Sequence, residues 1–72
     1  MSKFNHEQFC KRLKESVENS GLPLSALAEQ TGISEHMWLR YIDGESVPTY
    51  YHLRQICIAL HVRADYLLGI GE

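Results

Sequence analysis

Four histidines and two cysteines are the side chains of this 72-residue sequence best suited to ligate a transition metal or to act as nucleophiles. The histidines are His6, His36, His52 and His61. They share no metal-ligand spacing, and Cys10 and Cys57 fit no metal or redox motif. Both cysteines fall among apolar residues at helical spacing, which favours buried thiols over a disulfide or a reactive thiol. No phosphate-binding loop or nucleophile motif is present. The sequence therefore predicts no enzyme activity, no metal site and no cofactor.

A different chemistry is possible on one face of a helix that is predicted to begin after Ser34. Residues 35, 36, 39 and 40 share the face opposite Trp38 and Tyr41. If Trp38 belongs to the core, this face must meet water or a bound partner. Arg40 is its one member with a planar, forked donor, which suits the O6 and N7 acceptors of guanine.

Five short helices are predicted to position these residues, because apolar residues recur at helical spacing and no segment alternates like a strand. Asn5 (with Gln8 in a capping box), Ser34 and Thr49 are good N-caps for the first, third and fourth helices, and Pro23 suits the start of the second. The predicted helix ends are Gly21, Thr31-Gly32, Asp43-Gly44, His61 and Gly69. Histidine is enriched at positive φ, so His61 can end a helix where glycine is usual.

Helices this short cannot each bury an apolar face alone, so the sequence predicts one compact all-α bundle, a single domain over residues 1–72. The predicted apolar faces consist of Phe9, Leu13, Val17, Leu24, Leu27, Ala28, Ile33, Trp38, Tyr41, Leu53, Ile56, Cys57, Leu60, Tyr66, Leu67 and Leu68. A domain of this size buries only about 60% of its unfolded surface, which leaves little room for a substrate cavity.

Charge and hydropathy restrict the partners. Seven Lys and Arg against nine Asp and Glu give a net charge of −2, whereas DNA-binding domains usually have a basic excess. No apolar run approaches the roughly 18 residues of a membrane span. The opening MSKFNHEQF also lacks the apolar stretch of a signal peptide. The expected location is the cytoplasm, without membrane association.

The segment from Leu24 to Tyr41 reads as a short helix, a turn and a second helix. Ala28 is small where the two helices would cross, and Gly32 permits a left-handed turn. This is the helix-turn-helix plan, in which the second helix enters the DNA major groove. From Gly21 to Gly69, including ALAEQTGIS and ALHVRADYLLG, the sequence resembles the Cro and phage-repressor (XRE-like) helix-turn-helix family.

The resemblance implies a lambda-repressor-like DNA-binding domain with its helix-turn-helix in helices 2 and 3. It implies a transcriptional regulator, in many cases a repressor of phage, prophage or mobile-element origin, that binds a palindromic double-stranded operator as a homodimer. The base-reading positions then fall on Glu35, His36, Leu39 and Arg40, with Met37 on the same outward face. Glu35 could accept from a cytosine amino group, and Leu39 or Met37 could touch a thymine methyl.

The remaining implied contacts concern the DNA backbone and a second subunit. Backbone phosphates would be contacted by Lys11, Ser34 and Thr49. The dimer interface would consist of Tyr50, Tyr51, Arg63, Ala64 and Tyr66. Tyrosine is favoured at such contacts because it joins apolar area to a polar tip.

Several positions depart from the family pattern. Leu24 replaces a common phosphate-binding Gln, and Asp43 and Glu45 lie where basic or amide residues are common, which should weaken phosphate binding. Val17 and Ile42 replace an Arg–Glu pair and are expected to pack together.

The alternative function is a helix-turn-helix-fold protein-interaction module, antitoxin- or antirepressor-like, that binds a toxin or another regulator. It is favoured by the acidic balance and by apolar Leu24, Leu39 and Ile58 at positions that are often polar in the family.

Overall fold

A computed structural model describes residues 4–71, which form five helices and no strand. The helices are α1 (His6–Ser20), α2 (Leu24–Thr31), α3 (Glu35–Ile42), α4 (Tyr50–Leu60) and α5 (Ala64–Leu68). The prediction of an all-α chain with five short helices is confirmed. Residues 1–3 and 72 of the predicted domain lie outside the described residues. Within the described part, no helix is long and apolar enough to cross a membrane.

The three side-chain caps predicted from the sequence are present. Asn5, Ser34 and Thr49 each accept a hydrogen bond from the backbone N–H three residues later, at 2.9, 3.2 and 3.2 Å. Each cap satisfies one of the N–H groups that a helix start leaves without a partner. His61 ends α4 with φ 56°, as predicted, and its N–H donates to the carbonyls of Cys57 and Ile58.

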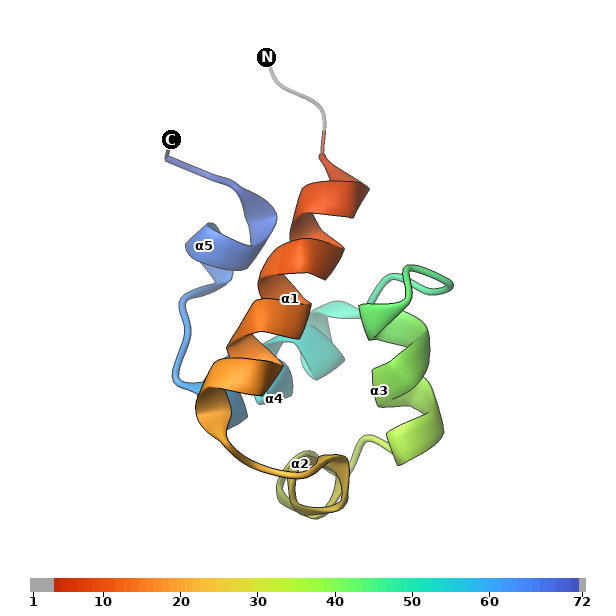
Figure 1. The fold of residues 1–72 in the computed structure, drawn as a ribbon. Helices are drawn as coiled ribbons and strands as arrows, with labels where there is room; N and C mark the ends of the chain where they lie inside the picture. The colour runs from red at the N-terminus through yellow and green to blue at the C-terminus, as the bar shows by residue number, and fades with distance from the viewer. Residues whose placement is uncertain (1–3, 72) are drawn as a thin grey trace.

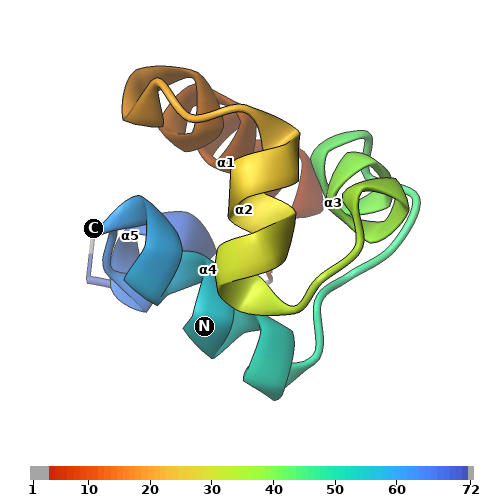
Figure 2. The same ribbon diagram turned by 90° about the horizontal axis from the view of Figure 1, so that it is seen from below.

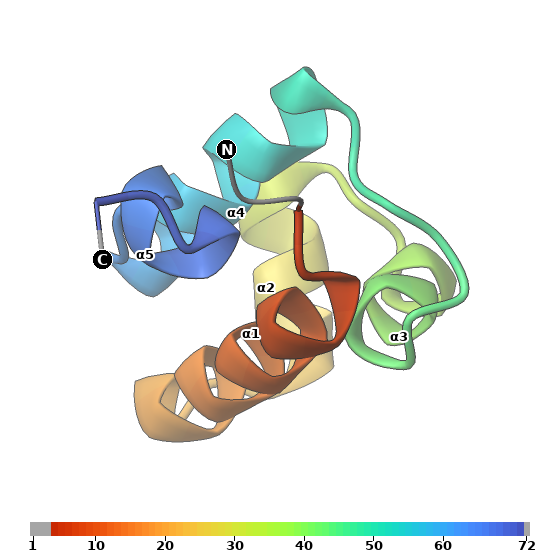
Figure 3. The same cartoon turned by 90° about the horizontal axis from the view of Figure 1, so that it is seen from above.

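The helices surround a single core, with α1 along one side of the molecule, between α5 and α3 in the view of Figure 1. The first half of α1 has α3 on one side and α5 on the other, which is clearest from above (Figure 3). From below, α2 crosses in front and connects the α1 end of the bundle to α3 (Figure 2). Helix α4 contacts α1, α2 and α5, so that all five helices share one apolar interior.

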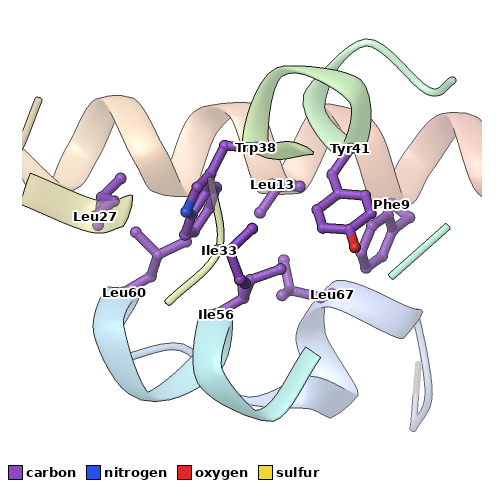
Figure 4. Packing of buried hydrophobic residues seen from close by; sticks show 9 residues of the cluster. All are labelled: Phe9, Leu13, Leu27, Ile33, Trp38, Tyr41, Ile56, Leu60 and Leu67. Atoms are coloured by element: carbon purple, nitrogen blue, oxygen red, sulfur yellow. The ribbon is translucent and has the colours of Figure 1, made fainter. Parts of the chain in front are cut away.

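That interior contains nine buried residues contributed by every helix and by the turn before α3 (Figure 4). They are Phe9, Leu13, Leu27, Ile33, Trp38, Tyr41, Ile56, Leu60 and Leu67. Trp38 is 0% exposed and points from α3 into the centre. Val17 and Ile42, which are predicted to pack together, are both half-buried and pack against this core.

Thr31 organises the turn between α2 and α3 from inside the protein. Its hydroxyl donates to the carbonyl of Leu27 at 2.6 Å. The same oxygen accepts from the backbone N–H of Ile33 at 3.2 Å and from Nε1 of Trp38 at 3.3 Å. One buried hydroxyl therefore satisfies two donors that would otherwise be buried without a partner, and fixes the start of α3 relative to α2.

Helix α5 is held against the first half of α1. The guanidinium of Arg12 donates to the carbonyl of Tyr66 and lies 4.7 Å from the centre of the Tyr66 ring. A Cβ added at Gly69 would lie 2.6 Å from Oε1 of Gln8, so the glycine is needed for this close approach as well as for its φ of 72°. The side chain of Gln8 thus lies close to Gly69 at the end of α5, and the hydrogen bond from it to the N–H of Asn5, which completes the predicted capping box, is not found among the described residues.

Candidate nucleic-acid interface

The outer face of α3 presents three exposed side chains of different chemistry. Glu35, His36 and Leu39 are all exposed, Leu39 to 46%. On the opposite side of the same helix, Trp38 and Tyr41 are 0% and 2% exposed. The structure therefore brings the predicted base-reading positions onto one surface, with an anion, an imidazole and an apolar group side by side.

Met37 does not belong to that surface. It is half-buried and packs against the core, whereas the sequence analysis placed it on the outward face. Met37 precedes Trp38, and on an eight-residue helix its direction lies between the inner and outer faces. Of the two residues expected to touch a thymine methyl, only Leu39 is well exposed.

Arg40 completes the outer face but is partly engaged within the protein. Its Nε donates to Oγ of Ser46 at 3.1 Å, and its Nη1 lies 3.9 Å from a carboxylate oxygen of Glu45. The arginine and glutamate side chains remain 39% and 59% exposed. An ion pair this open to water is worth about 0–1 kcal/mol, so a ligand can displace it.

Charge is the least favourable property of this surface for a polyanion. Residues 35–45 contain one arginine and three carboxylates, Glu35, Asp43 and Glu45, which gives a net charge of −2 for the segment with His36 neutral. Asp43 and Glu45 are both exposed beside the end of α3. Positive charge for phosphates must therefore come from elsewhere, such as exposed Lys11 on α1.

The two predicted hydroxyl contacts lie at helix starts. Ser34 and Thr49 are exposed, and their oxygens act as acceptors in the caps of α3 and α4. Each hydroxyl proton can still be donated to a phosphate. The positive end of the helix dipole at each site also attracts an anion.

The residues predicted to form a dimer interface fall into two groups. Tyr50 and Tyr51, 89% and 57% exposed, begin α4. Arg63, Ala64 and Tyr66 follow its other end, across a helix that is about 15 Å long. The Tyr66 ring is also covered on one side by Arg12. A partner would have to span both ends of α4 to contact all five residues.

A polar cluster that sequence reasoning missed links the start of α1 to the end of α3. His6 Nε2 lies 3.0 Å from the carbonyl oxygen of Gly44 and 3.7 Å from Sγ of Cys10, whose thiol reaches the carbonyl of Tyr41. Because a carbonyl oxygen only accepts, Nε2 carries the proton. The other ring nitrogen, Nδ1, is buried without a hydrogen-bond partner among the described residues. The residues at either end are 38 positions apart, so no local pattern predicts this cluster.

This cluster is not arranged for nucleophilic chemistry. Burial raises the pKa of the Cys10 thiol, and the nearby Asp43 carboxylate raises it further. Burial likewise raises the pKa of Cys57. Since the thiolate is the nucleophile, both cysteines are weak ones at neutral pH. Both are free thiols packed against the core, half-buried where the sequence predicts buried side chains.

No group of three potential metal ligands occurs among the described residues. A depression of about 260 Å³ lies between the ends of α2 and α4, lined by Gln30, Gln55, Ile58, Ala59 and His61. It is open to solvent, and His61 is the one titratable side chain of its lining.

Comparison of the chain with protein-family models, with curated proteins and with solved structures finds no match in any of the three.

Proposed function

We propose that this protein is a sequence-specific DNA-binding transcriptional regulator of the helix-turn-helix, XRE-like type. In this proposal α2 and α3 form the helix-turn-helix, and α3 enters the major groove of an operator. The protein acts as a homodimer on a palindromic site, as a repressor of the phage or mobile-element kind.

The observation that carries the proposal is the contrast across α3. Trp38 and Tyr41 fix the helix from inside, while Glu35, His36, Leu39 and Arg40 lie together on the outside. A rigid short helix with donors, acceptors and an apolar group on one exposed face meets the requirements for reading base edges.

Three of these four side chains have a distinct task in this proposal. Arg40 donates to guanine, Glu35 accepts from a cytosine amino group, and Leu39 covers a thymine methyl. The exposed hydroxyls of Ser34 and Thr49, with Lys11, fix the register by contacting phosphates. Two α3 helices one DNA turn apart, about 34 Å, would read two half-sites.

The experiment is selection of a preferred sequence from a library of random DNA duplexes, followed by affinity measurements on the selected duplex and on a shuffled one. Arg40→Ala should weaken binding to the selected duplex by about 1–3 kcal/mol and relax the preference at one base pair. Affinity for both duplexes should fall steeply as salt rises. If Arg40→Ala weakens binding to both duplexes equally, Arg40 contacts the DNA backbone and does not read a base.

A second candidate, a protein-interaction module, is favoured by the acidic balance around α3 and by exposed apolar side chains. Leu39 and Ile58 are 46% and 56% exposed. Leu24, which the sequence analysis placed with them, is half-buried against the core and offers less to a partner. Binding of an acidic surface to a protein does not require counterion release from DNA. Failure to enrich any duplex would therefore favour this candidate.

A further inference from the structure

The loop after α3 is folded around Arg40. The backbone carbonyl of Arg40 accepts from the N–H of Glu45 at 2.8 Å and from the N–H of Ser46 at 3.3 Å. The same two loop residues also face its side chain, Ser46 through its hydroxyl and Glu45 through its carboxylate. Arg40 is thus held by four contacts from two consecutive residues.

These contacts distinguish between the nitrogens of the guanidinium. Nε donates to the hydroxyl of Ser46 at 3.1 Å. The edge of the guanidinium that includes Nε is therefore not available to bind another acceptor. The end of the fork, Nη1 and Nη2, is directed away from that bond. Glu45 lies beside Nη1 at 3.9 Å, beyond the length of a good hydrogen bond. The guanidinium is therefore oriented by Ser46 and only partly neutralised by Glu45.

We propose, on the basis of the DNA-binding function above, that Ser46 and Glu45 set the base selectivity of Arg40. Ser46 is a positioning residue that presents Nη1 and Nη2 end-on to the O6 and N7 atoms of guanine. Glu45 lowers the attraction of Arg40 for phosphates, because a compensated charge gains little from an anion. A guanine edge is uncharged and binds through its two acceptors, so it loses much less.

Wild type and four variants test this on the selected and shuffled duplexes defined above. Ser46→Ala should weaken binding to the selected duplex about 3- to 10-fold, the value of one hydrogen bond, and leave the shuffled duplex nearly unchanged. Ser46→Thr retains the hydroxyl and should restore selectivity. An equal loss of Ser46→Ala on both duplexes, or no rescue by Ser46→Thr, would overturn the role of Ser46.

Glu45→Gln should strengthen binding to the shuffled duplex about 2- to 5-fold, with a smaller gain on the selected one, so that discrimination falls. Glu18→Gln is the matched control. It makes the same change in charge on exposed Glu18, which lies toward the far end of α1, about 18 Å along the helix from His6 and its contact with Gly44. It should change the affinity for both duplexes by the same factor. If Glu45→Gln behaves like Glu18→Gln, Glu45 contributes only net charge and its proposed role is wrong.

A measurement without DNA separates this inference from the proposed function. In NMR spectra of the free protein, the Nε–H of Arg40 should be rigid and protected from water, and Ser46→Ala should abolish that protection. The guanidinium of Arg63 is the reference for an Nε–H that no side chain anchors, because its side chain is 84% exposed and its contact with Asp65, at 3.4 Å, is made through Nη2. If Arg40 is as mobile as Arg63, the positioning is refuted even when DNA binding holds. A rigid Arg40 with no enriched duplex would refute the DNA-binding function and, with it, the selectivity role.

Discussion

The inner and outer faces of α3 are held by different kinds of contact. On the inner face, Trp38 bonds to Thr31, and the hydroxyl of Tyr41 lies 2.6 Å from Nδ1 of His52, so each aromatic residue has a buried or half-buried polar anchor. On the outer face, Arg40 is held by two residues of the following loop, half-buried Ser46 and Glu45, whose side chain is 59% exposed. The inner contacts tie α3 to α2 and α4, and the outer contacts tie it only to the segment that follows.

This difference separates stability from recognition within one eight-residue helix. Removing an inner contact leaves a cavity or an unsatisfied polar group in the core, which is costly. Removing an outer contact exposes more of a guanidinium whose side chain is already 39% exposed, which costs less. Substitutions on the inner face should therefore strongly lower the free energy of unfolding. Substitutions on the outer face should mainly weaken binding.

The largest effect is expected from Trp38→Ala. Deleting a fully buried aromatic side chain should lower the free energy of unfolding by about 3–5 kcal/mol, a large share of the total for a domain of this size. Chemical denaturation followed by circular dichroism measures the loss. A loss below about 1 kcal/mol would mean that the inner face is not the anchor of α3.

A smaller loss is expected when only the hydroxyl behind Trp38 is removed. Thr31→Val keeps the shape of the side chain but leaves the N–H groups of Ile33 and Trp38 without their acceptor. The free energy of unfolding should fall by about 1–3 kcal/mol. Thr31→Ser retains the hydroxyl and is the control. If Thr31→Ser destabilises the protein as much as Thr31→Val, methyl packing and not the hydrogen bonds accounts for the role of Thr31.

The pH dependence of stability in the alkaline range tests the contact that Tyr41 makes on the inner face of α3. Burial raises the pKa of Tyr41 above its ordinary value of 10.0. The unfolded chain therefore loses this proton first, so the contribution of Tyr41 to stability is complete below pH 10 and is lost as pH rises through the raised pKa. Stability measured against pH should fall above about pH 10 more steeply in the parent than in Tyr41→Phe. Parallel curves for the two proteins would contradict a raised pKa. The two cysteines, present in both proteins, cancel in this comparison.

The smallest effect on stability is expected on the outer face. His36→Ala should change the free energy of unfolding by less than about 0.5 kcal/mol, because the side chain is exposed. Met37→Ala, one residue further and half-buried against the core, should destabilise the protein more. Thermal melts of the two variants make the comparison. Similar losses would show that the boundary between the two faces lies elsewhere.

The sequence predicts well those features whose causes lie within one helical turn. The caps at Asn5, Ser34 and Thr49 and the left-handed stop at His61 each depend on a residue and its near neighbours. The inward faces of the helices follow from periodicity for the same reason. The misplacement of Met37 occurred where periodicity is weakest, at the edge between two faces.

Contacts between distant segments could not be predicted in this way. The bond between His6 and Gly44 and the contact between Arg12 and Tyr66 join residues 38 and 54 positions apart. They depend on how the helices cross, which no single segment determines. The contacts of Arg40 with Glu45 and Ser46 are nearer in sequence, but they require the loop to turn back on α3, and acidic and hydroxyl residues in a loop do not by themselves indicate such a turn.

The position of Trp38 also gives the protein an optical reporter of its own. It is the single tryptophan of the chain, fully buried, with its indole N–H bonded to Thr31 directly behind the outer face of α3. Its fluorescence comes from one environment, so a red shift in emission reports loss of the core without any attached dye. A ligand that covers the outer face does not touch the indole, and unfolding is therefore separable from binding in the same emission spectrum.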